Sequence, residues 1–433
     1  MSLTTSSPRL LTLLAILVSL GCGSGSGGDE AAESGDETSA AESGCEEEGE
    51  SCGFPAGLGA FPVHIVDFTI DEEALKTLLE ETTETESVIV AMTLNGQTLE
   101  GVELELHGGF AKGVPKKSFR IEIPDDLEFY PNLFGDGAEK QRRAVFNASW
   151  IDPSFQRHKL TMDLNRAEGG HAPRVAYTTL AFNGEIYGFF QVIERIDKLY
   201  LGRQDWRKSG NLYKAENHNA NWQSKSDPLK GFDHEEGEDN STEDLGALLD
   251  ALTNTPTTQA DFQESVAPLL DLENCLAGQR VHTFAMDQDS YTKNYFLYHD
   301  VKADPGDAED RFRVIAWDAD ATFGNNWDGT PVSAAEQDLI GTDAFSPRLM
   351  ELPEYKEAHL LAYQEALSGS FDSAALQETA SSMAETIGPW ARADLALWER
   401  EEVDFDEASA DLVSVIGTRH TIVSAAVADA LSE

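Results

Sequence analysis

Basic residues are scarce in this chain of 433 residues, which holds 31 Lys and Arg against 78 Asp and Glu and carries a formal charge of −47. Such an acidic surface repels polyanions, so we expect no nucleic acid among its partners. The basic residues that exist are unevenly placed, because seventeen of the 31 lie between Lys112 and Lys214. We therefore expect an anionic ligand to be tolerated in that region.

Long apolar runs are also rare. The run LLTLLAILVSL after Arg9 is too short to span a bilayer as a mature helix. It ends in small residues at Gly21-Cys22, a pattern that resembles a bacterial lipoprotein signal, and an ordinary secretory signal is the alternative. We expect residues 1–22 to be a signal peptide. The mature protein is then exported to the cell envelope and anchored to a membrane by a lipid on Cys22.

Cysteine is the third scarcity, with four residues in the chain. Cys45 and Cys52 bracket the segment CEEEGESC and are predicted to close a small disulfide loop in an oxidising compartment. No further Cys or His flanks this pair, which disfavours a metal site there. Cys275 falls in an apolar, helix-like stretch and is expected in the core.

The pattern along the chain predicts one folded domain behind a tether. Residues 23–58 are mainly Gly, Ser, Ala, Asp and Glu with little to bury, so we expect a disordered acidic tether. Residues 59–433 are predicted to form the domain, with a β-rich lobe over about 59–215 and a helical lobe over 216–433. The fold class is therefore α+β, with two lobes and a cleft.

Apolar periodicity supports this division. Alternation of period two predicts strands at 63–65, in SVIVAMTL, at 102–106 and at 119–123, while a helix is expected over 153–168. A hairpin turns at Asn183-Gly184, and the sheet of this half is expected to be antiparallel. A polar loop is expected over 216–241, then helices over 242–253, 259–285 and 354–431, with strands in YFLYHD and RFRVIAWD.

Several signatures of common enzymes are missing. The sequence has no G-x-x-x-x-G-K-[ST], no G-x-S-x-G and no H-E-x-x-H, which disfavours a P-loop enzyme, a serine esterase and a zinc protease. The spacing of His107, His158 and His171 singles out none of them. Each is expected to be a surface residue or a satisfied core residue.

An acidic constellation is present instead. Asp289 and Asn294 form D-x-x-x-x-N, and Asp318 and Asp320 form D-x-D after an apolar strand. In kinase-like phosphotransferases one Asp takes the proton of the acceptor hydroxyl, while an Asn five residues later and an Asp on the next hairpin coordinate Mg²⁺. The alternative is that these acidic residues cap turns.

A glycine turn is the second constellation. In LHGGFAKGVPKKSFRIEI a strand runs into Gly108-Gly109, and Lys116 and Lys117 follow. Glycines allow backbone N–H groups to approach phosphate oxygens, and a nearby Lys supplies positive charge. An ordinary surface hairpin is the alternative interpretation.

Taken in order, these segments resemble the CotH family, which is named for a spore-coat protein kinase. The resemblance spans about residues 60–425 and includes P-K-K-S-F at 115–119, D-P-S at 152–154 with Arg157, the N-G stretch with Glu194, and NLYKA with Lys214. The D-x-x-x-x-N and W-D-x-D segments follow, then a helical tail that begins SPRLMELPEY. One segment departs from the family, whose glycine turn usually reads R-G-N-S where this chain has H-G-G-F at 107–110.

The resemblance implies a kinase-like fold that uses ATP and Mg²⁺ to phosphorylate Ser or Thr of an exported or surface protein. Asp289 is then the catalytic base, Asn294 and Asp318 are metal ligands, and Asp320 is a supporting carboxylate. Gly108, Gly109 and Lys116 or Lys117 are then expected at the phosphates. The alternative is a catalytically inactive, kinase-like surface lipoprotein with a binding or structural role.

The expected anchor gives a direct test. Cys22→Ser removes the acylation site, so the variant should leave the membrane fraction and appear in the soluble fraction, whereas the wild type should stay with membranes. Fractionation followed by immunoblotting measures this. Identical partitioning of both proteins indicates an ordinary secretory signal.

Overall fold

The computed structural model describes residues 62–80, 87–237, 241–290 and 292–433. The predicted signal peptide, the tether, and the predictions for Cys22, Cys45 and Cys52 lie outside these residues. Among the helices in the described ranges, none is both long enough and apolar enough to cross a membrane.

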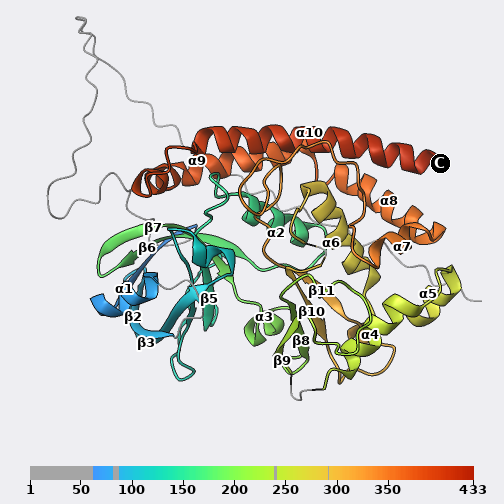
Figure 1. Ribbon diagram of the computed structural model, residues 1–433, viewed down its shortest axis with the longest axis horizontal. Coiled ribbons are helices and arrows are strands. Elements are labelled where there is room, and N and C mark those ends of the chain that lie inside the picture. The colour runs from blue at the N-terminus through green and yellow to red at the C-terminus, as the bar shows by residue number, and fades with distance from the viewer. Residues whose placement is uncertain (1–61, 81–86, 238–240, 291) are drawn as a thin grey trace, which may run out of the picture. The chain divides into compact units, whose positions relative to one another are not determined.

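The first half of the described chain is built on a closed β-barrel (Figure 1). Its strands adjoin in the order β1-β2-β3-β4-β5-β7-β6, and helix α1 (Glu72–Glu80) follows β1. The strands are β1 (Val63–Thr69), β2 (Val88–Leu94), β3 (Gln97–His107), β4 (Ser118–Glu122), β5 (Arg143–Asn147), β6 (Val175–Phe182) and β7 (Glu185–Glu194). The prediction of a β-rich first half is confirmed.

The closure of the barrel differs from the antiparallel sheet expected from sequence. All neighbours in the barrel are antiparallel except β1 and β6, which pair in parallel from Val63↔Tyr177 to Phe68↔Phe182. This long-range pairing leaves no free sheet edge, and Phe68, Phe119 and Phe190 fill the interior. The tight β6–β7 turn is as predicted, because Asn183 and Gly184 both have positive φ, 55° and 85°.

A second, four-stranded sheet lies in the order β11-β10-β8-β9. Its strands are β8 (Asn211–Ala215), β9 (Phe232–Glu236), β10 (Tyr295–His299) and β11 (Arg313–Ala316). The two short strands predicted in YFLYHD and RFRVIAWD are therefore present. Strand β9 lies inside the segment that was predicted as a polar loop. The sequence does not reveal this strand because Phe232 is its single buried residue, so apolar residues do not alternate along it.

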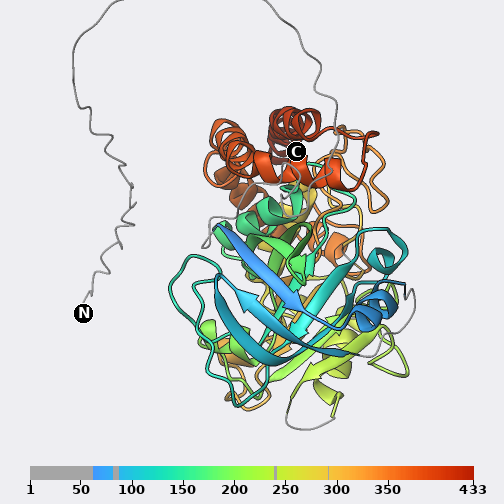
Figure 2. The ribbon, with the colours of Figure 1, turned by 90° about the vertical axis from the view of Figure 1, so that its left-hand side faces the viewer.

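Helices dominate the rest of the chain, as the sequence predicts. They are α2 (Arg157–Ala167), α3 (Lys198–Arg203), α4 (Glu243–Asn254), α5 (Gln259–Ser265), α6 (Leu272–Ala285), α7 (Ser346–Met350), α8 (Pro353–Leu367), α9 (Ser373–Leu397) and α10 (Phe405–Ser432), with short 3₁₀ turns η1 (Phe110–Gly113) and η2 (Ala308–Asp310). The two longest, α9 and α10, run side by side (Figures 1 and 2). The single helix expected over 259–285 is two helices, because the Asp271 carboxylate accepts the Asn274 N–H and starts α6 afresh.

One buried ion pair fastens α9 to the barrel. The Lys116 ammonium is 1% exposed and lies 2.8 Å from the carboxylate of Asp394 on α9, and it also donates to the carbonyls of Ala148 and Phe189. Asp394 in turn accepts the Phe189 N–H at 2.7 Å. A Cβ on Gly188 would stand 2.5 Å from the Asp394 carboxylate, so this close approach requires glycine.

Loss of one partner of this pair should be costly. Lys116→Ala leaves the Asp394 carboxylate buried without a cation, and we expect a loss of about 3–5 kcal/mol in unfolding free energy. Urea unfolding measures it, with Lys117→Ala as the matched control, since the Lys117 ammonium donates to the Lys112 carbonyl and makes no ion pair with a described residue. The main-chain N–H of Lys117, which donates to the Tyr187 hydroxyl, is unchanged by this substitution. The double variant Lys116→Met with Asp394→Asn should regain part of the loss. A Lys116→Ala protein as stable as the control contradicts this role.

Candidate functional site

A cleft brings together residues from both halves of the described chain. Gly108 and Gly109 line it from the turn after β3, and Asp289, Asp318 and Asp320 line it from the loops around β10 and β11. The glycine turn and the acidic residues that the sequence singles out thus share one cleft.

The loop between α6 and β10 presents Asp289. Helix α6 ends at Met286, whose φ of 54° is left-handed, and the chain then turns so that Asp287 is buried. One Asp287 carboxylate oxygen accepts the Asp289 N–H at 3.0 Å, and the other lies 2.8 Å from Nδ1 of His282. The Asp287 side chain, which is itself fixed by His282, therefore fixes the main chain at Asp289.

The carboxylate of Asp289 has two further partners. Asn294 Nδ2 donates to Asp289 Oδ2 and to the Asp289 carbonyl, each at 3.0 Å, and Lys293 Nζ lies 2.7 Å from Oδ2. Asn294 has a φ of 60°, a conformation that Asn tolerates better than most residues. The Asn294 side chain thus closes the D-x-x-x-x-N segment into a loop. Lys293, which lines the cleft and pairs with Asp289, is a site residue that the sequence prediction missed.

The D-x-D turn lies directly beside this loop. The Trp317 N–H donates to the Asn294 carbonyl, and the Gln288 N–H donates to the Ala321 carbonyl. Asp318 follows with a φ of 53°, a left-handed conformation that costs energy in a residue other than glycine. These backbone bonds fix the two acidic motifs against each other.

Ionisation of the Asp318 and Asp320 carboxyl groups is unfavourable in the folded protein. Burial and the neighbouring Asp289 raise the pKa of Asp318 to about 6, and burial and Asp318 raise the pKa of Asp320 well above its ordinary value. Within the part of the chain that the structure describes, no hydrogen-bond donor or cation pairs with either side chain. Crowded, unpaired carboxylates of this kind are what a bound cation would relieve.

The donor set fits Mg²⁺ better than a metal that needs a full protein cage. The described residues contain no group of three or more His, Cys, Asp and Glu side chains that could hold a metal ion by themselves. Mg²⁺ usually takes one or two carboxylates and completes its shell with water and phosphate oxygens. Asp318 and Asp320 line the cleft and offer hard oxygen ligands of this type. Asn294, the other predicted ligand, is not in the cleft lining and contributes to a separate pocket.

The turn after β3 brings a neutral group to the opposite wall. His107 lines the cleft, and burial together with the charges of Lys214 and Arg195 lowers its pKa to about 3. Phe110 makes an edge-to-face contact with Trp327 at 6.0 Å, and both are about half exposed. The position that carries Arg in the family pattern therefore carries no charge here.

Lys116 and Lys117 do not reach the cleft. Lys116 is enclosed in its ion pair with Asp394, and Lys117 donates to the Lys112 carbonyl at 2.6 Å. Neither is among the residues that line the cavity. The structure thus brings together the glycines and the acidic residues of the predicted site, but places both lysines elsewhere.

Three other motif residues have mainly structural contacts. Arg157 lies 2.6 Å from Asp152, and its Nε donates to the Phe323 carbonyl, which ties the D-P-S turn to the loop after Asp320. Glu194 is a buried acceptor for Arg174 and Arg203 at 2.9 and 2.7 Å. Lys214 pairs with Glu216, and its charge opposes the rise in the pKa of Asp318.

His158 is the second residue that sequence spacing could not single out. It lies on α2, lines the cleft and is 1% exposed. Its Nδ1 accepts the Ala319 N–H at 3.2 Å, and burial lowers its pKa to about 4. The prediction of a satisfied core residue is only half met, because Nε2 has no partner among the described residues.

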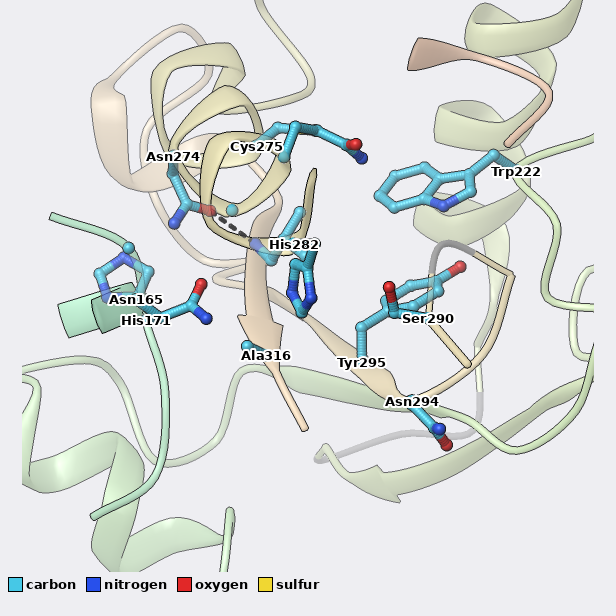
Figure 3. Close-up of a pocket in the computed structure, with 14 residues that line it drawn as sticks. Asn165, His171, Trp222, Asn274, Cys275, His282, Ser290, Asn294, Tyr295 and Ala316 are labelled. Atoms are coloured by element: carbon cyan, nitrogen blue, oxygen red, sulfur yellow. Dashed lines mark hydrogen bonds between the residues drawn. The ribbon is translucent and has the colours of Figure 1, made fainter. Parts of the chain in front are cut away.

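A smaller pocket is lined by residues of α6, β10 and β11 (Figure 3). Ser290 and Asn294 contribute to it, together with Trp222, Tyr295 and Cys275. Cys275 is 3% exposed, as predicted, and burial raises the pKa of its thiol. This pocket has no carboxylate in its lining, so the acid chemistry belongs to the cleft.

Comparison with known proteins identifies the family. The family described as "CotH kinase protein" matches residues 104–423, which contain the glycine turn and both acidic motifs. The chain belongs to the CotH kinase family. It is also similar to the inner spore coat protein H of Bacillus subtilis (strain 168), with 24% identity over 328 residues that cover 74% of this chain and 85% of that protein. The predicted family is confirmed, and the β-rich first part and helical second part fit a kinase-like fold.

The raised pKa of Asp318 predicts that the unfolding free energy of this CotH-family kinase depends on pH. The ordinary pKa is 3.8, and the folded-state pKa is about 6. The folded protein therefore binds a proton at Asp318 more tightly than the unfolded chain does. The stabilisation that this proton gives is complete below the ordinary pKa and is lost as the pH rises through about 6. Asp318→Asn should therefore stabilise the metal-free protein by about 1 kcal/mol at pH 7.5, after allowance for solvent screening, and by little at pH 4.

Urea unfolding in the presence of a chelator measures this difference at both pH values. Asp338→Asn is the matched control, because Asp338 is an exposed carboxylate whose side chain makes no hydrogen bond or ion pair with a described residue. A variant at position 318 that is less stable than wild type at pH 7.5 contradicts the electrostatic account.

Proposed function

We propose that this CotH-family kinase transfers the terminal phosphoryl group of ATP to a Ser or Thr hydroxyl of an exported or surface protein, with Mg²⁺ as cofactor. The observation that supports it is the juxtaposition of Asp289, held by Asn294 and Lys293, with Asp318 and Asp320 in one cleft. A base and an oxygen-rich metal site are the two parts that phosphoryl transfer needs most.

Asp289 is the proposed base. The acceptor oxygen attacks the terminal phosphorus, the bond from that phosphorus to the bridging oxygen breaks, and ADP leaves while the hydroxyl proton passes to the Asp289 carboxylate. Lys293 and Asn294 both contact Oδ2 of Asp289, and they orient this carboxylate before it accepts the proton. The buried Asp287 holds the Asp289 main chain through its N–H.

Asp318 and Asn294 would hold Mg²⁺, with Asp320 in support. The cation, when bound, would neutralise charge on the phosphate chain. Because Lys116 and Lys117 lie away from the cleft, and His107 is neutral, the walls supply little positive charge of their own. We therefore expect nucleotide binding to depend strongly on the metal.

The same shortage of positive charge supports a second candidate function. A kinase-like lipoprotein that binds a partner without catalysis would keep the scaffold, and a glycine turn without the Arg, Asn and Ser of the family pattern fits such a role. In either case we propose that residues 1–22 direct export and that Cys22 carries a lipid anchor at the cell envelope. The lipoprotein-like sequence pattern supports this localisation.

The proposed roles separate by mutation. Asp318→Ala should abolish magnesium-dependent nucleotide binding, because the phosphate charge is left uncompensated beside Asp289 and Asp320. Asp289→Asn should still bind nucleotide but lose phosphoryl transfer by about 10²–10⁴-fold, because it removes the base and keeps the shape. Calorimetric titration with ATP and Mg²⁺ measures binding, and radiolabel transfer to co-exported proteins measures catalysis.

The exposed Asp338→Asn variant serves as the control for both assays and should behave as the wild type. If the wild type binds no nucleotide, the enzyme proposal fails and the binding-protein alternative stands. If Asp318→Ala binds as tightly as wild type, the assigned metal ligand is wrong.

A further inference from the structure

One buried nitrogen in the cleft wall has no partner. His158 stands on the first turn of α2, beside the buried Arg157–Asp152 pair, and it lines the same cleft as Asp318 and Asp320. It is 1% exposed, and its Nε2 makes no hydrogen bond with any described residue. A buried polar atom left unpaired is costly, so native proteins rarely keep one without a reason.

Geometry fixes where the ring proton lies. Nδ1 of His158 is 3.2 Å from the main-chain nitrogen of Ala319, which can only donate. Nδ1 must therefore accept and carry no proton, so the proton of the neutral ring is on Nε2. The unpaired atom is thus an N–H donor, held in position by the residue between Asp318 and Asp320.

The cleft needs donors of this kind. Bound phosphates require N–H groups or cations, yet Lys116 and Lys117 lie elsewhere and Lys293 is occupied by Asp289. The glycine turn also lacks the Arg, Asn and Ser of the family pattern. A neutral N–H next to the D-x-D turn suits a phosphate oxygen, because it donates a hydrogen bond without adding a cation that would pair with the carboxylates of the cleft.

We propose that His158 is a further ligand-binding residue of the cleft, whose Nε2–H donates a hydrogen bond to a phosphate oxygen of the bound nucleotide. This inference rests on the proposed function, since it presupposes that the cleft takes ATP with Mg²⁺. It adds a donor on the α2 side, next to the D-x-D turn. The imidazole then has two tasks: Nδ1 accepts the Ala319 N–H, and Nε2–H donates to the phosphate oxygen.

Two substitutions separate these tasks. In His158→Asn the side-chain oxygen can replace Nδ1 as the acceptor for the Ala319 N–H, but no donor reaches the Nε2 position. In His158→Gln the amide N–H can reach the Nε2 position and restore the donor. The matched control is His359→Asn on α8, because His359 is also 1% exposed, donates from Nε2 to the Leu339 carbonyl at 2.7 Å, and has no partner for Nδ1 among the described residues.

Calorimetric titration of ATP with Mg²⁺, and of adenosine alone, into the four proteins tests the proposal. His158→Asn should bind ATP about 10- to 100-fold more weakly than wild type, which is the effect of losing one hydrogen bond to a charged group. His158→Gln should recover most of the affinity, and His359→Asn should match the wild type. Adenosine should bind all four proteins alike, because it has no phosphate.

Three results would overturn the proposal. ATP affinity in His158→Asn equal to wild type excludes the phosphate contact. A loss of ATP affinity in His158→Gln with none in His158→Asn shows that His158 only supports the D-x-D turn through its Nδ1. An equal loss of adenosine binding points to a general distortion of the cleft. Absence of ATP binding by the wild type is a different failure, because it removes the proposed function itself.

Discussion

The Lys116–Asp394 ion pair is the constraint on which the cleft depends. It joins the segment before β4 to α9, and its two side chains are almost completely buried. The walls of the cleft come from the barrel turn on one side and from the loops around β10 and β11 on the other. Helix α9 packs against α10, and α10 contacts α6, the helix that precedes the Asp289 loop, so the ion pair connects the two walls through these helices. A buried charge pair gives a defined geometry, because a shift of either partner leaves an unpaired charge.

A second constraint opposes stability within the site. Asp318 adopts a left-handed backbone conformation, and it shares the cleft with Asp289 and Asp320 at a cost that appears as raised carboxyl pKa values. The surrounding hydrogen bonds, from Asp287 to Asp289 and from Trp317 to Asn294, hold these groups in place despite their repulsion. Such local conflict, supported by a rigid environment, is typical of sites that bind a cation or stabilise charge.

The sequence predicts the parts of this structure that depend on local pattern. Alternating apolar residues reveal most strands, and the D-x-x-x-x-N spacing identifies Asp289 and Asn294, whose bond closes within one loop. Features that depend on distant contacts were missed. The closure of the barrel needs β1 beside β6, and the partner of Lys116 is 278 residues away, so a lysine near a glycine turn resembled a phosphate ligand. The sequence did not single out His158, because its hydrogen-bond partner Ala319 is 161 residues away in the chain.

The central claim is that the cleft binds a nucleotide through a metal held by carboxylates. Thermal unfolding of the wild type with no addition, with Mg²⁺, with ATP, and with both together tests it most directly. A ligand that binds only the native state raises the melting temperature, and saturation by ATP with Mg²⁺ should raise it by about 5 °C. ATP alone should have little effect, because its phosphates would face unscreened carboxylates. No shift with both ligands, or an equal shift with ATP alone, would contradict the account.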